Sequence, residues 1–167
     1  FISQIKQNKP ITITYPQMTR FLLPLRDAVA LVEFAFNHAN QGDLFIKKAP
    51  ACTIADLAAA LRNIFKSDVP EKIIGIRHGE KIYETLATRE ELMRAEDMGD
   101  YYRIRLDDRS LNYVNYGKYF FEGSIQEAEL EDYTSHNTER LNVEQVEQLL
   151  LSLPEVQAEL EDWTGGK

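Results

Sequence analysis

The sequence predicts an α/β fold followed by an acidic, helical C-terminal extension. Patterns typical of strands and helices alternate along residues 1–106, as they do in α/β proteins. The net charge is +2 over residues 1–106 and −10 over residues 107–167, which separates the two parts. The 167 residues are 44% hydrophobic, enough to bury a core. We therefore expect an α/β part at 1–106 and an acidic extension at 107–167.

The first predicted elements are a helix, a strand and a longer helix. Residues 1–9 have the pattern of the last turns of an amphipathic helix, which Pro10 ends. β-branched residues alternate over 11–15 and predict a strand. Apolar residues recur at helical spacing over 24–40, which predicts an amphipathic helix that begins at Pro24. The stripe that we expect this helix to bury comprises Leu25, Ala28, Val29, Val32, Ala35, Phe36 and Ala39.

The rest of the α/β part continues the alternation. Thr53 and Asp56 have the spacing of a capping box and predict the start of a helix over 53–66. Its expected buried stripe comprises Ile54, Leu57, Ala58, Leu61, Ile64 and Phe65. Strands are predicted at 44–46, 72–76 and 101–106, and a short helix at 90–98.

The acidic extension contains two predicted helices. Asn142 and Gln145 have cap spacing and predict a helix over 142–153, and Pro154 begins a second short helix that ends near Trp163. The apolar face of the helix at 142–153 has two possible partners, the body of the same chain and another subunit. No clear period is found at 107–125, and the acidic run at 127–132 is interpreted as a solvated face or partner surface.

The composition excludes several classes of protein. No apolar run approaches the roughly 18 residues that a membrane-spanning helix needs. A net charge of −8 argues against nucleic acid and anionic membranes as partners. The single cysteine, Cys52, excludes an internal disulfide and a multi-cysteine zinc site. These features fit a cytoplasmic protein. Because the chain begins at Phe1 within the pattern of an amphipathic helix, we expect it to be a piece of a longer protein.

The strongest candidate site is the turn that follows the predicted strand at 72–76. The guanidinium of Arg77 can bind a diphosphate through two parallel hydrogen bonds, and Glu80 can accept hydrogen bonds from sugar hydroxyls. Ligands of α/β sheets gather at the carboxyl ends of strands, which is where this turn lies. Arg20, between a predicted strand and a helix, is a second candidate for the diphosphate. For both arginines the alternative is an ordinary charged residue of the surface.

The remaining candidates are weaker. His78 has the side chain of an acid or base near neutral pH, but no two histidines have metal spacing. Cys52 precedes a helix cap, which can lower a thiol pKa, yet no paired histidine accompanies it, so we expect no nucleophilic role. The sequence has no glycine-rich dinucleotide loop, P-loop, Tyr-x-x-x-Lys pair or G-x-S-x-G motif. The residues alone therefore predict an anion-binding turn, no metal site and no complete catalytic set.

Two segments carry a resemblance to a known family. They are Met18-Thr-Arg-Phe-Leu-Leu-Pro-Leu-Arg-Asp-Ala-Val and Ile73-Ile-Gly-Ile-Arg-His-Gly-Glu-Lys-Ile-Tyr-Glu-Thr-Leu. They resemble the C-terminal half of nucleotide-sugar dehydratases and epimerases of the extended short-chain dehydrogenase/reductase superfamily. More narrowly, the chain is similar to bacterial UDP-N-acetylglucosamine 4,6-dehydratases that also invert carbon 5, which serve capsule or O-antigen biosynthesis.

The resemblance implies the end of a Rossmann sheet plus a substrate-binding lobe. Residues 24–40 and 43–48 would complete the Rossmann sheet, whereas 10–15, 53–66 and 71–84 would belong to the substrate lobe. The full-length protein would use NADP or NAD, bind UDP-N-acetylglucosamine or a related UDP-sugar, and form a homo-oligomer.

The resemblance also assigns roles to the candidate residues. Arg20 and Arg77 would grip the diphosphate of UDP, and Glu80 would bind a ribose hydroxyl. The glycine-rich cofactor loop and the catalytic acid and base would lie in an N-terminal Rossmann half, before Phe1. We therefore expect the chain to be inactive alone and to bind no cofactor tightly.

Two alternatives remain open. The full-length protein can instead be a UDP-sugar 4-epimerase, or the chain can be a non-catalytic module that binds UDP-sugars or assists assembly. A glycine-rich loop upstream would favour the enzymes, and its absence would favour the module.

Overall fold

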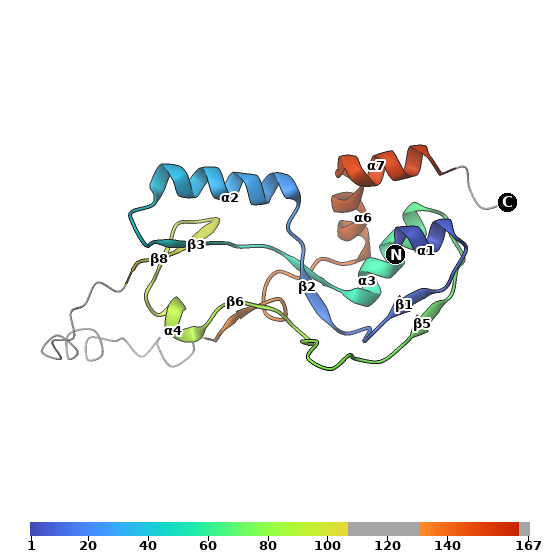
Figure 1. Cartoon of the computed structure of the whole chain (residues 1–167), viewed down its shortest axis with the longest axis horizontal. Helices are drawn as coiled ribbons and strands as arrows, with labels where there is room; N and C mark the ends of the chain where they lie inside the picture. The colour runs from blue at the N-terminus through green and yellow to red at the C-terminus, as the bar shows by residue number, and fades with distance from the viewer. Residues whose placement is uncertain (107–130, 164–167) are drawn as a thin grey trace, which may run out of the picture. The chain divides into compact units, whose positions relative to one another are not determined.

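The computed structural model describes residues 1–106 and 131–163, which form two compact units. Unit 1 contains residues 1–24, 49–84 and 135–163, and unit 2 contains 25–48, 85–106 and 131–134. The expectations for 107–125 and 127–130 lie outside the described residues. Both units mix helices and strands, so the predicted α/β class is confirmed (Figure 1). The expected division of the chain at residue 106 stays a prediction.

Unit 1 is built around helix α3 (Ile54–Ile64). The hydroxyl of Thr53 accepts a hydrogen bond from the backbone N–H of Asp56, so the predicted cap begins this helix. Strand β1 (Ile11–Ile13) pairs in parallel with β5 (Glu71–Ile73), and α1 (Ile2–Lys6) precedes them. The expected stripe of α3 packs into a core with these elements. The fully or nearly fully buried members of this core are Ile5, Ile11, Ile13, Ala58, Leu61, Phe65 and Val69.

The C-terminal helices complete unit 1. Asn142 and Gln145 form a capping box at the start of α6 (Val143–Leu151), and Pro154 is the first residue of α7 (Pro154–Glu161). The apolar face of α6 packs on α3 around a second core of Cys52, Ala60, Leu141 and Val146. Of the two partners left open for this face, the structure therefore shows the body of the same chain. The indole N–H of Trp163 donates to the carbonyl of Phe65.

Two further strands of unit 1 were not predicted. Strand β2 (Thr19–Phe21) runs antiparallel to β4 (Ala51–Thr53), with Arg20 opposite Cys52. Each strand has three residues, too few to show a period of two in the sequence. The residue that we expected in a connection, Arg20, is therefore held in a strand.

Unit 2 contains α2 (Leu25–His38) and a three-stranded antiparallel sheet. In this sheet β8 (Tyr101–Ile104) lies between β3 (Leu44–Lys47) and β7 (Ala95–Asp97). Strand β6 (Thr85–Ala87) pairs with β9 (Tyr133–Thr134). The small core of the unit consists of Ile46, Ala87 and Ile104.

The helix expected at 90–98 is wrong in its second half. Helix α4 covers only Arg89–Leu92, with a capping box formed by Thr88 and Glu91. Residues 95–97 instead pair with β8. The hydrogen bonds that β8 offers across the sheet outweigh the local helical pattern there.

The stripe predicted to be buried on α2 is also wrong for this chain. Leu25 is 71% exposed and Phe36 is 86% exposed, and Val29 and Val32 are exposed as well. The helix instead contacts the sheet through Phe34, whose ring stacks on Tyr101 at a centroid distance of 4.1 Å. The structure thus covers one side of α2 and leaves its most apolar stripe open.

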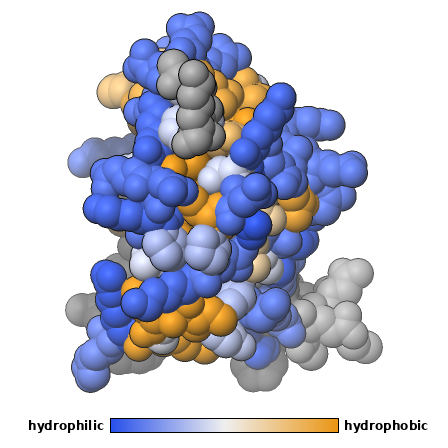
Figure 2. Space-filling view, turned by 90° about the vertical axis from the view of Figure 1, so that its right-hand side faces the viewer, coloured by the Kyte–Doolittle hydropathy of each residue, from blue (hydrophilic) through white to orange (hydrophobic). Residues whose placement is uncertain are grey.

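Unit 1 has a mostly polar surface on the side that carries α1 and α7. Figure 2 shows hydrophilic residues over most of this face, with separate apolar patches between them. No helix among residues 1–106 and 131–163 is both long enough and apolar enough to cross a membrane.

Candidate functional site

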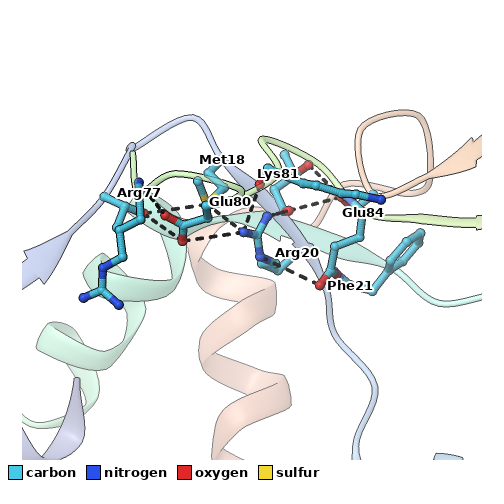
Figure 3. Close-up of polar contacts among 10 residues, drawn as sticks. Met18, Arg20, Phe21, Arg77, Glu80, Lys81 and Glu84 are labelled. Atoms are coloured by element: carbon cyan, nitrogen blue, oxygen red, sulfur yellow. Dashed lines mark hydrogen bonds and ion pairs between the residues drawn. The ribbon is translucent and has the colours of Figure 1, made fainter. Parts of the chain in front are cut away.

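Strand β2 and the segment of residues 77–84 come together within unit 1. The backbone N–H of Thr19 donates to the carbonyl of Ile82 at 3.0 Å, which fixes the strand against this segment. Arg20 extends from β2 toward Glu80 and Glu84 (Figure 3). The site therefore joins parts of the chain that lie some sixty residues apart, as the Arg20 contact with Lys81 illustrates.

The guanidinium of Arg20 is held mainly by neutral acceptors. Its Nη1 donates to the carbonyl of Thr19 at 2.8 Å, and its Nη2 donates to the carbonyl of Lys81 at 3.0 Å. Carboxylate oxygens of Glu80 and Glu84 lie farther away, at 3.9 and 3.8 Å. The side chain is 25% exposed. The positive charge is thus fixed in place before any ligand arrives and remains accessible to one.

Glu80 closes the turn that bears Arg77. Its carboxylate accepts from the backbone N–H of Arg77 at 3.2 Å, and its own N–H donates to the carbonyl of Arg77 at 3.0 Å. The hydroxyl of Thr14 lies 3.4 Å from the other carboxylate oxygen. Gly79 adopts a φ of +82°, which glycine tolerates better than other residues. The carboxylate of Glu80 is therefore oriented by the turn while 27% of its side chain stays exposed.

Arg77 contributes a guanidinium that no described residue binds. The residue is exposed, and Figure 3 shows its side chain directed away from Arg20. The structure therefore brings Arg20 and Glu80 together, whereas the Arg77 side chain reaches into solvent from the same turn. A free guanidinium keeps all its donors for an anionic ligand.

Three residues of this region were missed by the sequence reasoning. Glu84 accepts a hydrogen bond from the backbone N–H of Phe21 at 3.2 Å. Thr19 and Ser135 form a buried pair of hydroxyls next to Arg20. Glu84 lies inside the second segment quoted above and could have been found from it. Ser135 gave no signal, because its partners are more than fifty residues away.

The other candidates are structural or unsupported. Cys52 is fully buried, and burial together with the nearby Asp56 charge raises the pKa of its thiol to about 11. The ring of His38 stacks on Phe34 and hydrogen-bonds the carbonyl of Phe34. His78 is exposed on the turn. Within the described part of the chain, no group of three or more His, Cys, Asp or Glu side chains could hold a metal ion.

The described residues also offer no cradle for a dinucleotide. In the sequence, the eight glycines form no G-x-G-x-x-G motif of the kind that precedes a helix in dinucleotide-binding folds. This chain therefore supplies no glycine-rich loop for the pyrophosphate of NAD or NADP.

Comparison with known proteins gives consistent results. A family model described as "Polysaccharide biosynthesis protein" matches residues 1–106, and one described as "Polysaccharide biosynthesis protein C-terminal" matches residues 107–157. Proteins named UDP-glucose 4-epimerase from Rickettsia canadensis and Rickettsia felis are 57% and 56% identical to the chain over 162 residues. The alignments cover 97% of this chain and 47% of each relative. The chain therefore spans about half the length of the relatives that it matches.

The fold has a counterpart among solved structures. The X-ray structure of Pen from Bacillus thuringiensis superposes with a TM-score of 0.71 at 28% sequence identity. The superposition covers 90% of this chain and 42% of Pen. Both comparisons thus align the chain with a part of a longer protein.

Proposed function

We propose, since this chain belongs to the family of polysaccharide biosynthesis proteins, that it is the nucleotide-sugar-binding half of a UDP-sugar-converting enzyme. Its fold is that of the C-terminal part of an extended short-chain dehydrogenase/reductase.

The observation that carries the proposal is the arrangement around Arg20. A guanidinium fixed by two backbone carbonyls, a second guanidinium free on the adjacent turn, and an oriented carboxylate lie within one unit. Arg20 and Arg77 would bind the diphosphate, because guanidinium groups match phosphate oxygens in charge and geometry. Glu80 would accept hydrogen bonds from the ribose hydroxyls. A nucleoside diphosphate carries both groups.

The exposed apolar stripe of α2 supports the proposal that the full-length protein has a second, N-terminal half. We propose that the exposed residues Leu25, Val29, Val32 and Phe36 pack against the N-terminal Rossmann half of the full-length protein. The relatives are about twice as long as this chain, which leaves ample chain to cover the stripe. That half would also hold NADP or NAD and the catalytic residues. The full-length protein would act in the cytoplasm as a homo-oligomer.

Two reactions on the UDP-sugar are candidates. The long acidic C-terminal extension favours a UDP-N-acetylglucosamine 4,6-dehydratase that also inverts carbon 5, whose product is a dehydrated 4-ketone. The names of the relatives favour a UDP-sugar 4-epimerase, whose product differs only in configuration at carbon 4. A non-catalytic UDP-sugar-binding module would form neither product.

One assay separates these candidates. The full-length protein is incubated with NAD or NADP and either UDP-N-acetylglucosamine or UDP-glucose, and the products are identified by NMR. A 4-ketone supports the dehydratase, and a carbon-4 epimer supports the epimerase. Calorimetric UDP binding without any product supports the binding module. Absence of UDP binding contradicts the proposal.

A further inference from the structure

A buried pair of hydroxyl groups links the C-terminal segment to the strand that bears Arg20. Thr19 is 1% exposed and Ser135 is fully buried, and their side-chain oxygens are 2.8 Å apart. The two residues lie 116 positions apart in the sequence. Each belongs to a different one of the two segments that match the family models.

The hydroxyl of Ser135 makes three hydrogen bonds that are mutually consistent. It donates its proton to the carbonyl of Thr19 at 3.1 Å. It accepts from the backbone N–H of Glu84 at 2.9 Å and from the hydroxyl of Thr19. One donor and two acceptor positions are all that a serine hydroxyl has, so every one is used.

The carbonyl of Thr19 connects this pair to Arg20. The same oxygen accepts from Nη1 of Arg20 at 2.8 Å and from the Ser135 hydroxyl. Ser135 also binds both backbone polar groups of Glu84. Its hydroxyl accepts from the N–H of Glu84, and the backbone N–H of Ser135 donates to the carbonyl of Glu84 at 2.8 Å. The Glu84 carboxylate in turn lies 3.8 Å from Nε of Arg20. Ser135 thus holds two of the groups that surround the guanidinium.

We propose that Ser135 is a positioning residue for Arg20: it orients the carbonyl and the carboxylate that direct the guanidinium toward the diphosphate of a nucleoside diphosphate. The inference rests on the proposed function, because it assumes that Arg20 binds that diphosphate. It adds that a serine of the C-terminal segment controls how strongly the diphosphate is bound. Loss of the hydroxyl leaves the part-buried backbone N–H of Glu84 without its acceptor and lets the carbonyl of Thr19 turn.

The test compares UDP with uridine, which lacks the diphosphate. Binding of each to full-length protein is measured by calorimetry for wild type and for the Ser135→Ala, Arg20→Met and doubly substituted variants. Ser152→Ala is the matched control, because its hydroxyl also donates to a carbonyl but at the end of α6. We expect Ser135→Ala to weaken UDP binding about tenfold and to leave uridine binding within about twofold. In the Arg20→Met background the same substitution should change UDP binding little.

Each outcome bears on a separate statement. Equal weakening of UDP and uridine binding, or no change in either, overturns the positioning role of Ser135. If Arg20→Met weakens UDP binding but Ser135→Ala does not, the inference fails while the proposed function stands. If Arg20→Met leaves UDP binding unchanged, both the diphosphate role of Arg20 and the inference are overturned. Should Ser135→Ala fail to fold, Ser135→Cys replaces it with the same criteria, because the thiol is similar in size and a weaker hydrogen-bonding group.

Discussion

Arg20 donates a hydrogen bond to the carbonyl of Lys81 at 3.0 Å, and this bond holds its guanidinium beside the turn that carries Arg77. The two arginines differ in what holds them. Arg20 is restrained by backbone carbonyls, whereas the guanidinium of Arg77 has no partner among the described residues. The binding predictions rest on a restrained cation beside an oriented carboxylate and on a free cation that extends into solvent from the same turn.

Arg77→Ala is expected to weaken UDP binding without affecting folding. Loss of a charged hydrogen bond to the diphosphate should cost about 1.5–3 kcal/mol of binding free energy. The free energy of unfolding should change by less than about 0.5 kcal/mol, because the side chain is exposed and unbound. Calorimetry with UDP measures the first quantity and chemical denaturation the second. Lys72→Ala, which removes an exposed cation from β5, is the control. Unchanged UDP affinity in Arg77→Ala would remove Arg77 from the site.

Cys52 is expected to resist thiol reagents while unit 1 is folded. Its pKa is raised from 9.0 to about 11 by burial, so the reactive thiolate is about one-hundredfold rarer at pH 8 than in an ordinary cysteine. Labelling by a disulfide reagent at pH 8 should therefore follow unfolding, and the same reagent in denaturant gives the reference rate. Because the raised pKa favours the folded state only while the thiol is protonated, this contribution is present below pH 9 and is lost as the pH rises toward 11. Rapid labelling of the native protein would contradict the buried position.

Asp43 is expected to make the stability of unit 2 sensitive to acid. The backbone N–H of Asn40 and the guanidinium of Arg103 hold the pKa of the Asp43 carboxyl below its ordinary value of 3.8. A lowered pKa contributes stability above the unfolded value, and this contribution disappears as the pH falls below 3.8 through the folded value. Asp43→Asn should therefore lower the melting temperature at pH 7, and the difference from wild type should shrink below pH 3.8.

A matched substitution checks this assignment. Asp100→Asn also removes a carboxylate from unit 2, but its side chain is 81% exposed and lies 3.6 Å from Lys47. Exposed ion pairs of this kind contribute little to stability. A melting temperature that responds equally to both substitutions would show that Asp43 has no special role.

Phe36→Ala is expected to change the free energy of unfolding differently in residues 1–167 and in the full-length protein. In residues 1–167 the side chain is 86% exposed, so the free energy of unfolding should change by no more than about 0.5 kcal/mol. If the N-terminal half covers the stripe, the same substitution in the full-length protein should cost about 3–5 kcal/mol. Denaturant titrations of both lengths give the comparison.

Phe65→Ala serves as the reference for a side chain that is buried in either length. Phe65 is 1% exposed, and its ring contacts Trp163 edge-on at a centroid distance of 6.1 Å. Its substitution should cost about 3–5 kcal/mol in both proteins. If Phe36→Ala is as mild in the full-length protein as in residues 1–167, the N-terminal half does not cover the α2 stripe.

Local sequence was sufficient where the determining residues are neighbours along the chain. The cap at Thr53, the capping box of Asn142 with Gln145, and Pro154 predicted where three helices begin, because each satisfies or removes backbone N–H groups within one turn. The turn from Arg77 to Glu80 is local as well, and the structure shows the hydrogen bonds that close it. Arg20 and Glu80 could therefore be named as candidate site residues from the sequence. That they lie close to each other could not be predicted from it.

Tertiary structure decided the features whose partners are distant. Apolar spacing predicted a helix over 24–40, which the structure shows as α2 (Leu25–His38). The sheet that this helix contacts selected the side bearing Phe34 rather than the stripe bearing Phe36. The three-residue strand β2 exists because β4 supplies hydrogen-bonding partners some thirty residues away. Ser135 reaches Thr19 across 116 residues, and no local pattern can encode such a contact. A period along the sequence reports which side chains share a face, whereas only the packed chain determines what that face meets.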